Sequence, residues 1–285
     1  MVKKTILIPV YDTISIADLK PYFEIARDNN LHLNIQVFAI APSPPIFTYG
    51  YSPYGMPTIP NEWQKAAQEI AREAENKVTE IEDALTKESV STDVIRTFCE
   101  LSAVSEAASE LALVSDIAIL SNSLRINEGA FPRILSGVLY ESPIAAVVNP
   151  DSLQKVLHPK KVFIAWDASV QAAKAVQQVL PLIDENCEIH IGCFDIAANE
   201  GVRGEDPGTD IAAKLSRHGC AVTLHQYSSG GRDIADGIKR KAAELGADDL
   251  IVMGAYGHSK LRERVFGGTT QSMLDQTEQA IFFAH

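Results

Sequence analysis

Short apolar runs alternate along the chain with stretches in which apolar residues return every three or four positions. The run at residues 5–10 (TILIPV) precedes a helix-like stretch at 16–26, and residues 31–39 form another strand-like run. Between Trp63 and Leu85 the apolar positions recur at three- and four-residue steps, which predicts a long amphipathic helix. Strands that alternate with helices predict parallel sheets with helices on both faces.

The second half of the chain repeats the pattern of the first. Three pairs of segments correspond: 4–13 (KTILIPVYDT) with 161–169 (KVFIAWDAS), 115–121 (SDIAILS) with 248–254 (DDLIVMG), and 143–148 (PIAAVV) with 280–284 (AIFFA). Prolines and polar residues near 149–159 mark a linker. We therefore predict two α/β domains, at 1–150 and 158–285.

The later half contains further predicted elements. Residues 188–194 and 221–227 are expected to be strands, and a helical face that starts at Ile234 should stop at Gly246. The segment 42–60 is rich in Pro, Gly and Tyr and cannot be a regular element, so it is either an irregular surface excursion or a lid with exposed tyrosines.

Charge and hydropathy exclude several classes of protein. The net charge is −12, which disfavours broad binding to nucleic acid or to an anionic membrane. No apolar run approaches the ~20 residues of a membrane span, and the N-terminal run is too short for a signal peptide. The four cysteines form no C-x-x-C pair, so they are expected to be free thiols. These features predict a cytoplasmic protein.

A glycine-rich segment supplies the candidate chemistry. It reads Gly254-Ala-Tyr-Gly257, then nine residues, then Gly267-Gly268-Thr269-Thr270. Glycines let backbone N–H groups approach phosphate oxygens, and a helix that follows can face the anion with its N-terminus. Thr269 or Thr270 can cap a helix that starts at Gln271, and Lys260, Arg262 and Arg264 could screen phosphate charge or form a solvated face.

Topology brings a second residue to this segment. In an open parallel sheet, ligands bind at the carboxyl ends of the strands where the strand order reverses. In the second half, the first strand ends at Asp167 and the fourth ends at Gly254. Both features are therefore expected to meet at one crevice.

The spacing G-x2-G-x9-G resembles the nucleotide signature of the universal stress protein family, as do the surrounding LIVMGAYGHSKLRERVFGGTT and the openings ILIPV and KVFIAWDAS. The resemblance covers nearly the whole chain as two tandem domains. It implies doubly wound, Rossmann-like domains of the adenine nucleotide alpha hydrolase type, each with a five-stranded parallel sheet of order 3-2-1-4-5. It also implies that the terminal strands pair the two halves and that a homodimer can form.

The resemblance implies that the second half binds ATP, with which Mg2+ can associate. Asp167 would lie beside the adenosine, Cys193 would line the adenine through its backbone, and Gly254, Gly257 and Gly267 would hold ribose and phosphates. The family has Ser or Thr directly after the last glycine, whereas here Gly268 intervenes and the hydroxyl falls to Thr269 or Thr270. No catalytic residue or metal ligand is assigned.

The first half departs further from the signature. Ser121 and Leu124 stand where the second half has glycines, and Tyr11 aligns with Asp167. A Cβ at the lost glycine positions should obstruct phosphate, so we predict that this half does not bind ATP in the family manner.

Two other sequence features are weaker evidence of function. The segment 229–233 (SGGRD) resembles a pyrophosphatase loop but precedes a helix, so Asp233 is expected to cap that helix. His218, Cys220 and His225 show no convincing metal-ligand spacing.

Three hypotheses remain for the function. The first is a nucleotide-binding stress or regulatory protein with at most slow ATP hydrolysis, because no Walker-type lysine or dedicated base is evident. The second is an ATP-using enzyme with an adenylating or phosphotransfer activity, for which Asp167 is the candidate base. The third is a nucleotide-free interaction scaffold.

Overall fold

The computed structural model describes residues 4–43, 60–196, 208–247, 249–255, 268–276 and 278–285. The chain divides into two compact units, Met1–Ala118 with Ser123–Ser142, and Ile119–Asn122 with Pro143–His285. Each unit is described by itself below. Most of the 42–60 segment that sequence singled out lies outside the described residues.

The first unit is built on parallel strands in the order β3-β2-β1-β4. The strands are β1 (Thr5–Tyr11), β2 (His32–Ile40), β3 (Ser91–Cys99) and β4 (Ile117–Leu120). The last two residues of β4 belong to the second unit. Ile6, Leu7 and Ile8 of the inner strand β1 are 1% exposed or less, as expected for a strand that is covered on both faces.

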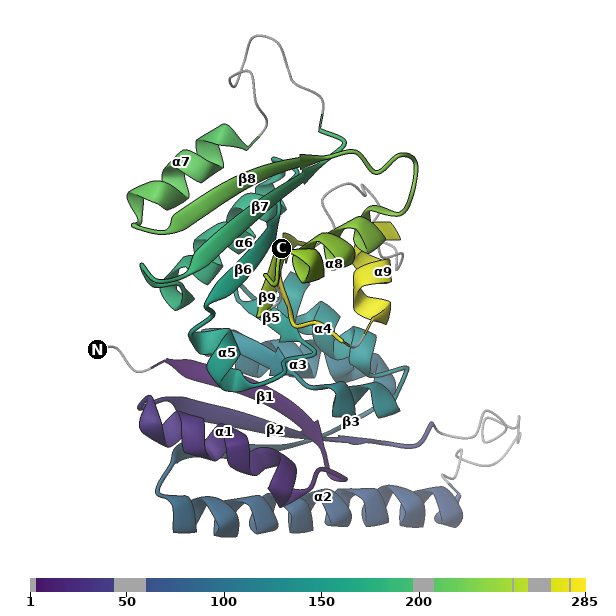
Figure 1. Ribbon diagram of the computed structural model, residues 1–285. Coiled ribbons are helices and arrows are strands. Elements are labelled where there is room, and N and C mark those ends of the chain that lie inside the picture. The colour runs from purple at the N-terminus through teal and green to yellow at the C-terminus, as the bar shows by residue number, and fades with distance from the viewer. Residues whose placement is uncertain (1–3, 44–59, 197–207, 248, 256–267, 277) are drawn as a thin grey trace, which may run out of the picture. The chain divides into compact units, whose positions relative to one another are not determined.

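Helices cover both faces of these strands (Figure 1). They are α1 (Ile16–Asp28), α2 (Asn61–Glu88), α3 (Val104–Ala112) and α4 (Phe131–Tyr140), with short 3-10 helices at Leu101–Ala103 and Asn122–Ile126. α1 packs with α2, and α3 packs with α4. The α3–α4 contact is close at Gly137, where an added Cβ would lie 2.1 Å from the carbonyl oxygen of Ser105.

The second unit has the strand order β5-β10-β9-β6-β7-β8. Its strands are β5 (Ala145–Val148), β6 (Lys161–Ala165), β7 (Glu188–Phe194), β8 (Ala221–Tyr227), β9 (Leu250–Gly254) and β10 (Ile281–Ala284). Its helices are α5 (Leu153–Leu157), α6 (Val170–Val179), a 3-10 helix at Leu180–Leu182, α7 (Thr209–Arg217), α8 (Ile234–Glu244) and α9 (Gly268–Asp275).

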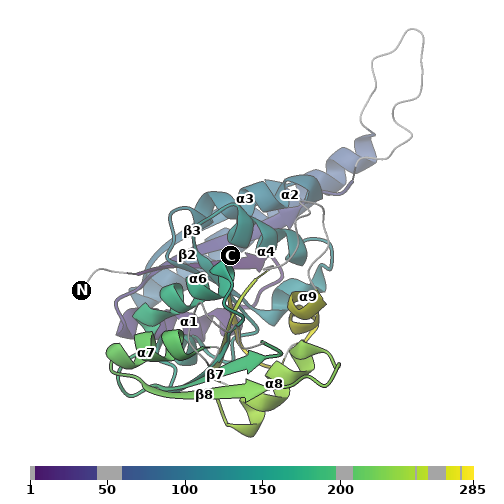
Figure 2. The same ribbon diagram turned by 90° about the horizontal axis from the view of Figure 1, so that it is seen from above.

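Successive side chains of β7 identify the helix on each face of the second unit. A Cβ added at Gly208, next to α7, would lie 3.0 Å from the sulfur of Cys193. A Cβ added at Gly237 of α8 would lie 2.8 Å from the ring of Phe194. Because neighbouring side chains of a strand point to opposite faces, α7 and α8 cover opposite sides of β7 (Figure 2).

The strand order of both halves matches the prediction. β3-β2-β1-β4 continues to β5 in the first half, and β8-β7-β6-β9-β10 forms the same 3-2-1-4-5 order in the second. β10 is parallel to β9 but antiparallel to β5, with Ile281 opposite Val148. The predicted linker near 149–159 contains the short helix α5. The domain limits 1–150 and 158–285 stay a prediction.

Equivalent carboxylates anchor the first strand of each half. Asp116 accepts a hydrogen bond from the Thr5 amide at 2.7 Å, and Asp249 accepts from the amides of Lys160 at 3.0 Å and Lys161 at 3.2 Å. The residue that follows each carboxylate is opposite Ile6 in the first half and Val162 in the second, so Thr5 corresponds to Lys161 and Tyr11 to Asp167.

Within the described residues, none of the helices combines the length and the apolar character needed to cross a membrane.

Candidate functional site

The carboxyl ends of β6 and β9 lie side by side in the second unit. The two strands are parallel neighbours, and Ala165 is opposite Met253. Asp167 follows β6 by two residues, and Gly254 is the last residue of β9. The structure therefore brings Asp167 and Gly254 to the same edge of the sheet, as the sequence predicted.

The loop after β6 holds Asp167 in a defined turn. The Trp166 amide donates to the carbonyl of Gly192 at 2.9 Å, and Oδ1 of Asp167 accepts from the Ser169 amide at 3.0 Å. Ser169 then caps α6 by accepting from the Ala172 amide at 3.1 Å. Ala168 between them has φ +60°, a left-handed conformation that is costly for alanine. The exposed carboxylate of Asp167 is thus held at the carboxyl end of β6, next to the end of β9.

Gly254 has a packing role that sequence alone did not reveal. A Cβ at this position would lie 2.5 Å from the Ala172 nitrogen and 2.7 Å from the carbonyl carbon of Gln171. The first turn of α6 therefore lies too close to β9 for any side chain there. This contact accounts for the glycine without a ligand, and the role of Gly254 in binding stays a prediction.

Cys193 is buried near the end of β7 and faces α7. It is 2% exposed, and an added Cβ at Gly208 would contact its sulfur at 3.0 Å and Cδ1 of Leu224 at 2.8 Å. Burial, together with the negative charge of Asp167, raises the pKa of the Cys193 thiol to about 11. The side chain is therefore a packed, protonated thiol, which leaves the backbone as the part of Cys193 that can meet a ligand.

The helix after the glycine-rich segment starts earlier than the sequence suggested. α9 begins at Gly268 rather than at Gln271, so Thr269 and Thr270 are residues of its first turn and not caps that precede it. Thr270 is 5% exposed and Thr269 is half-buried, whereas a Cβ at Gly268 would meet no atom of a described residue within 4 Å. Gly257, Gly267 and the basic residues 260, 262 and 264 lie outside the described residues.

The first unit fills the corresponding region with its own side chains. Tyr11, at the position of Asp167, is 8% exposed, and Leu124, at the position of Gly257, is fully buried. Oδ1 of Asn127 accepts hydrogen bonds from the amides of Gly129 at 3.2 Å and Ala130 at 3.1 Å, directly before α4. A side-chain oxygen thus occupies the amides that precede this helix.

Arginines of the first unit also fold back onto their own segment. The Arg125 guanidinium lies over the ring of Phe131, 4.4 Å from its centroid, and Nη1 of Arg133 donates to the carbonyl of Gly129. These contacts hold the two guanidinium groups against atoms of the same segment, so the groups are less available to a ligand from solution.

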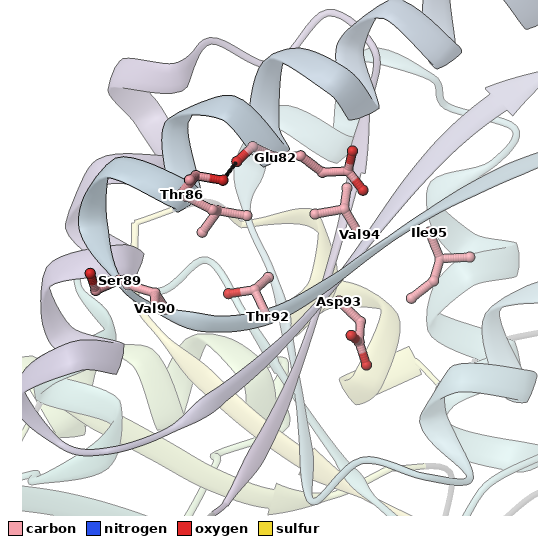
Figure 3. A pocket seen from close by; sticks show the side chains of 9 residues that line it. Glu82, Thr86, Ser89, Val90, Thr92, Asp93, Val94 and Ile95 are labelled. Atoms are coloured by element: carbon pink, nitrogen blue, oxygen red, sulfur yellow. Dashed lines mark hydrogen bonds between the residues drawn. The ribbon is translucent and has the colours of Figure 1, made fainter.

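Two cavities lined by described residues lie away from the crevice. One, of about 720 Å³, opens between the C-terminal turns of α2 and the edge strand β3, and the acids Glu82 and Asp93 are its charged residues (Figure 3). The other, of about 460 Å³, lies where β7 and β8 meet the first turns of α8, and Phe194 and Tyr227 contribute its rings. No cluster of three or more potential metal ligands occurs among the described residues.

The sequence did not predict that a histidine of β7 contacts a histidine of β8. Nδ1 of His190 lies 3.0 Å from Nε2 of His225. Sequence considered His225 with His218 and Cys220, which precede it on the same segment, but the partner comes from the neighbouring strand. Only the pairing register, in which Gly192 is opposite His225, places the two rings together.

Comparisons with known proteins agree with this architecture. No protein-family model matches the sequence, and no curated protein matches it. A solved universal stress protein from Archaeoglobus fulgidus DSM 4304 aligns over 98% of this chain and 95% of its own, with a TM-score of 0.64 and 16% identity. A protein of unknown function from Pseudomonas aeruginosa PAO1 aligns over 99% and 92%, with a TM-score of 0.54 and 12% identity.

These likenesses establish the fold class. The chain is an α/β protein with parallel sheets flanked by helices, and its architecture is similar to that of a universal stress protein along nearly its full length. At identities of 12–16%, they establish the fold alone.

Proposed function

We propose that the chain is a universal stress protein that binds ATP in its second half and that binding serves regulation rather than rapid catalysis. The observation that carries the proposal is the register of β6 and β9, which brings Asp167 to the start of the segment Gly254–Thr270. The G-x2-G-x9-G spacing of that segment suits backbone contacts to phosphate.

The described residues fit part of a nucleotide. The exposed Asp167 carboxylate can accept hydrogen bonds from ribose hydroxyls at the mouth of the crevice. A Cβ at Gly268 would contact no atom of the described residues, which supports the approach of a phosphate to the first turn of α9. Mg2+, where it accompanies ATP, would bind phosphate oxygens and water.

The proposal restricts ATP to the second half because the first half lacks an equivalent space. Leu124 and Tyr11 are buried side chains where the second half has Gly257 and an exposed carboxylate. The oxygen of Asn127 already satisfies two amides before α4. A phosphate there would have to displace packed atoms and an internal hydrogen-bond acceptor.

The described residues at the ends of β6 and β7 support binding without rapid turnover. Cys193 is held protonated by burial, and Asp167 is the exposed acidic side chain that follows β6. Rapid phosphoryl transfer needs a positioned nucleophile together with cations at the phosphates. Slow hydrolysis and a nucleotide-free scaffold are the alternatives that experiment must separate from regulated binding.

Isothermal titration with ATP tests the proposal on the full chain. We expect one equivalent of ATP per wild-type chain. Gly257→Leu, which copies Leu124 of the first half, should abolish binding because the added side chain fills the phosphate approach. Asp167→Asn should weaken binding by about tenfold, the effect of losing about 1.4 kcal/mol of charge-assisted hydrogen bonding.

Asp12→Asn is the matched control, because Asp12 is the acid that follows Tyr11 in the first half. It should leave ATP affinity unchanged, and circular dichroism should show that all variants are folded. A stoichiometry of two, or equal affinity of Gly257→Leu and wild type, would contradict the assigned site. A kcat above about 1 s⁻¹, a rate typical of dedicated ATP-using enzymes, would favour the enzymatic alternative.

A further inference from the structure

The pair His190–His225 lies on the α8 face of the second unit, between β7 and the edge strand β8. His190 is 6% exposed, and its Nε2 lies 3.0 Å from Oε1 of Glu188 while its Nδ1 lies 3.0 Å from Nε2 of His225. Since a carboxylate can only accept, Nε2 of His190 carries a proton. In the neutral pair, Nδ1 of His190 therefore accepts from the N–H of His225.

Charged and titratable groups surround the pair from each neighbouring element. On β6, Lys161 lies 3.2 Å from Oε2 of Glu188. On β8, the ring of Tyr227 stacks on His225 at 5.7 Å with an interplanar angle of 6°. On α8, Lys241 lies 5.2 Å from the centroid of Tyr227 and also pairs with Glu244. Glu188 lies at the His190 end of the pair, and Lys241, paired with Glu244, lies at the His225 end.

The number of protons on the two rings determines how the His190–His225 contact responds to a fall in pH. One added proton can be accommodated, because a single cationic ring still has a neutral acceptor opposite it. With two added protons, Nδ1–H of His190 faces Nε2–H of His225, and two donors at 3.0 Å repel each other. The second proton can therefore bind only when the rings separate.

We propose that His190 and His225 form a proton-responsive contact that fastens the edge strand β8 to β7 and that opens when the pair takes up its second proton from solvent. The first half supplies a natural comparison without this chemistry. By register, Asn34 occupies the position of His190 and Ile95 that of His225.

The direction of the pH effect follows from the same surroundings. Burial lowers the pKa of His225 below its ordinary value, and the nearby His190 and Lys241 lower it further. Because the unfolded chain then binds this proton more readily than the folded one, the contribution of His225 to stability is complete above the ordinary histidine pKa of about 6.5. It is lost as the pH falls through the lower folded pKa.

Nuclear magnetic resonance of the histidine ring protons tests the contact in the wild-type chain between pH 8 and 5. We expect His225 to titrate below the ordinary histidine pKa of about 6.5, and His190→Asn, which copies the first half, to move its titration toward that value. If His225 titrates at the ordinary value in the wild type, the proposal is overturned.

Amide hydrogen exchange across Ala221–Tyr227 tests the mechanical consequence. After correction for intrinsic rates, exchange in the wild type should be faster at pH 5 than at pH 7, because the contact that holds β8 is lost as the pair takes up protons. His225→Ile, which copies Ile95, should remove the increase, whereas His218→Gln should retain it. An equal increase in the wild type and His225→Ile would refute a role for the pair.

Discussion

At the residue scale, Ala168 has a strained backbone conformation in the loop that holds Asp167. Its φ of +60° lies between the carboxylate of Asp167 and the capping residue Ser169. An alanine in this region costs about 1–2 kcal/mol, and the surrounding hydrogen bonds hold it in place. The strained conformation turns the chain sharply from β6 into α6 and keeps Asp167 at the carboxyl end of β6.

Ala168→Gly should stabilise the protein by about 0.5–1 kcal/mol, since glycine adopts positive φ without strain but is more flexible when unfolded. Urea denaturation measures the change. Ala173→Gly, within α6, is the matched control and should destabilise by about 1 kcal/mol through lower helix propensity. If both variants are destabilised alike, the strain assigned to Ala168 does not exist.

Individual site residues were predictable only where their signal is local. Asp167 and Gly254 end apolar runs, so the sequence placed them at strand ends. The packing role of Gly254 was not predictable, because the atoms that exclude its Cβ belong to α6, more than 80 positions away. The His190–His225 contact likewise depends on strand register, which hydrophobic alternation does not specify between two strands.

At the element scale, the two glycines that flank the candidate phosphate segment have different surroundings. Gly254 contacts the backbone of α6, whereas a Cβ at Gly268, the first residue of α9, would meet none of the described residues. Their substitution by alanine should therefore separate folding from binding.

Gly254→Ala should destabilise the fold by about 1–3 kcal/mol, because its Cβ would overlap the backbone of Gln171 and Ala172. Gly268→Ala should leave the free energy of unfolding unchanged or slightly higher, since alanine favours helix. If Gly268 approaches phosphate, this second variant should weaken ATP binding. Thermal denaturation and calorimetric titration measure the two effects, and a stable Gly254→Ala would refute the packing role.

Most elements were predictable because their periodicity is strong. The strands at 188–194 and 221–227 and the long helix that contains Trp63 and Leu85 were recovered closely. Asp233 accepts from the Ala235 amide at 3.0 Å, as expected for a cap. The start of α9 was misplaced because glycine and threonine are weak helix formers, and tertiary packing of the buried Thr270 overrides that preference.

At the scale of the whole molecule, the compact units do not end where the sequence repeat does. β5 closes the first repeat in sequence, but it belongs to the second compact unit and pairs with β10. Residue patterns show the repeat, whereas the partner of a terminal strand depends on which edge it meets. β10 is thereby covered on both sides, by β5 and β9.

This pairing predicts how fragments of the chain behave. A fragment 158–285 would lack β5 and expose the edge of β10, so it should self-associate or aggregate. A fragment 143–285 keeps β10 (IFFA) covered and exposes instead the edge of β5 (AAVV), which meets β4 in the whole chain and has smaller apolar side chains, so it should self-associate less at the same concentration. Sedimentation velocity distinguishes the two fragments, and equal behaviour of both would show that β5 does not protect the edge of β10.

Because of the Asn127 hydrogen bonds, the first half needs no ligand at the start of α4, whereas the second half is proposed to bind one. The amides of Gly129 and Ala130 are satisfied by a covalently attached oxygen, so nothing dissolved is required there. If the second half binds ATP, its stability rises with ligand concentration by mass action, while that of the first half stays constant. The stability of the second half would then report the ATP concentration around the protein. The stability of the first half would not change with ATP and would serve as an internal reference.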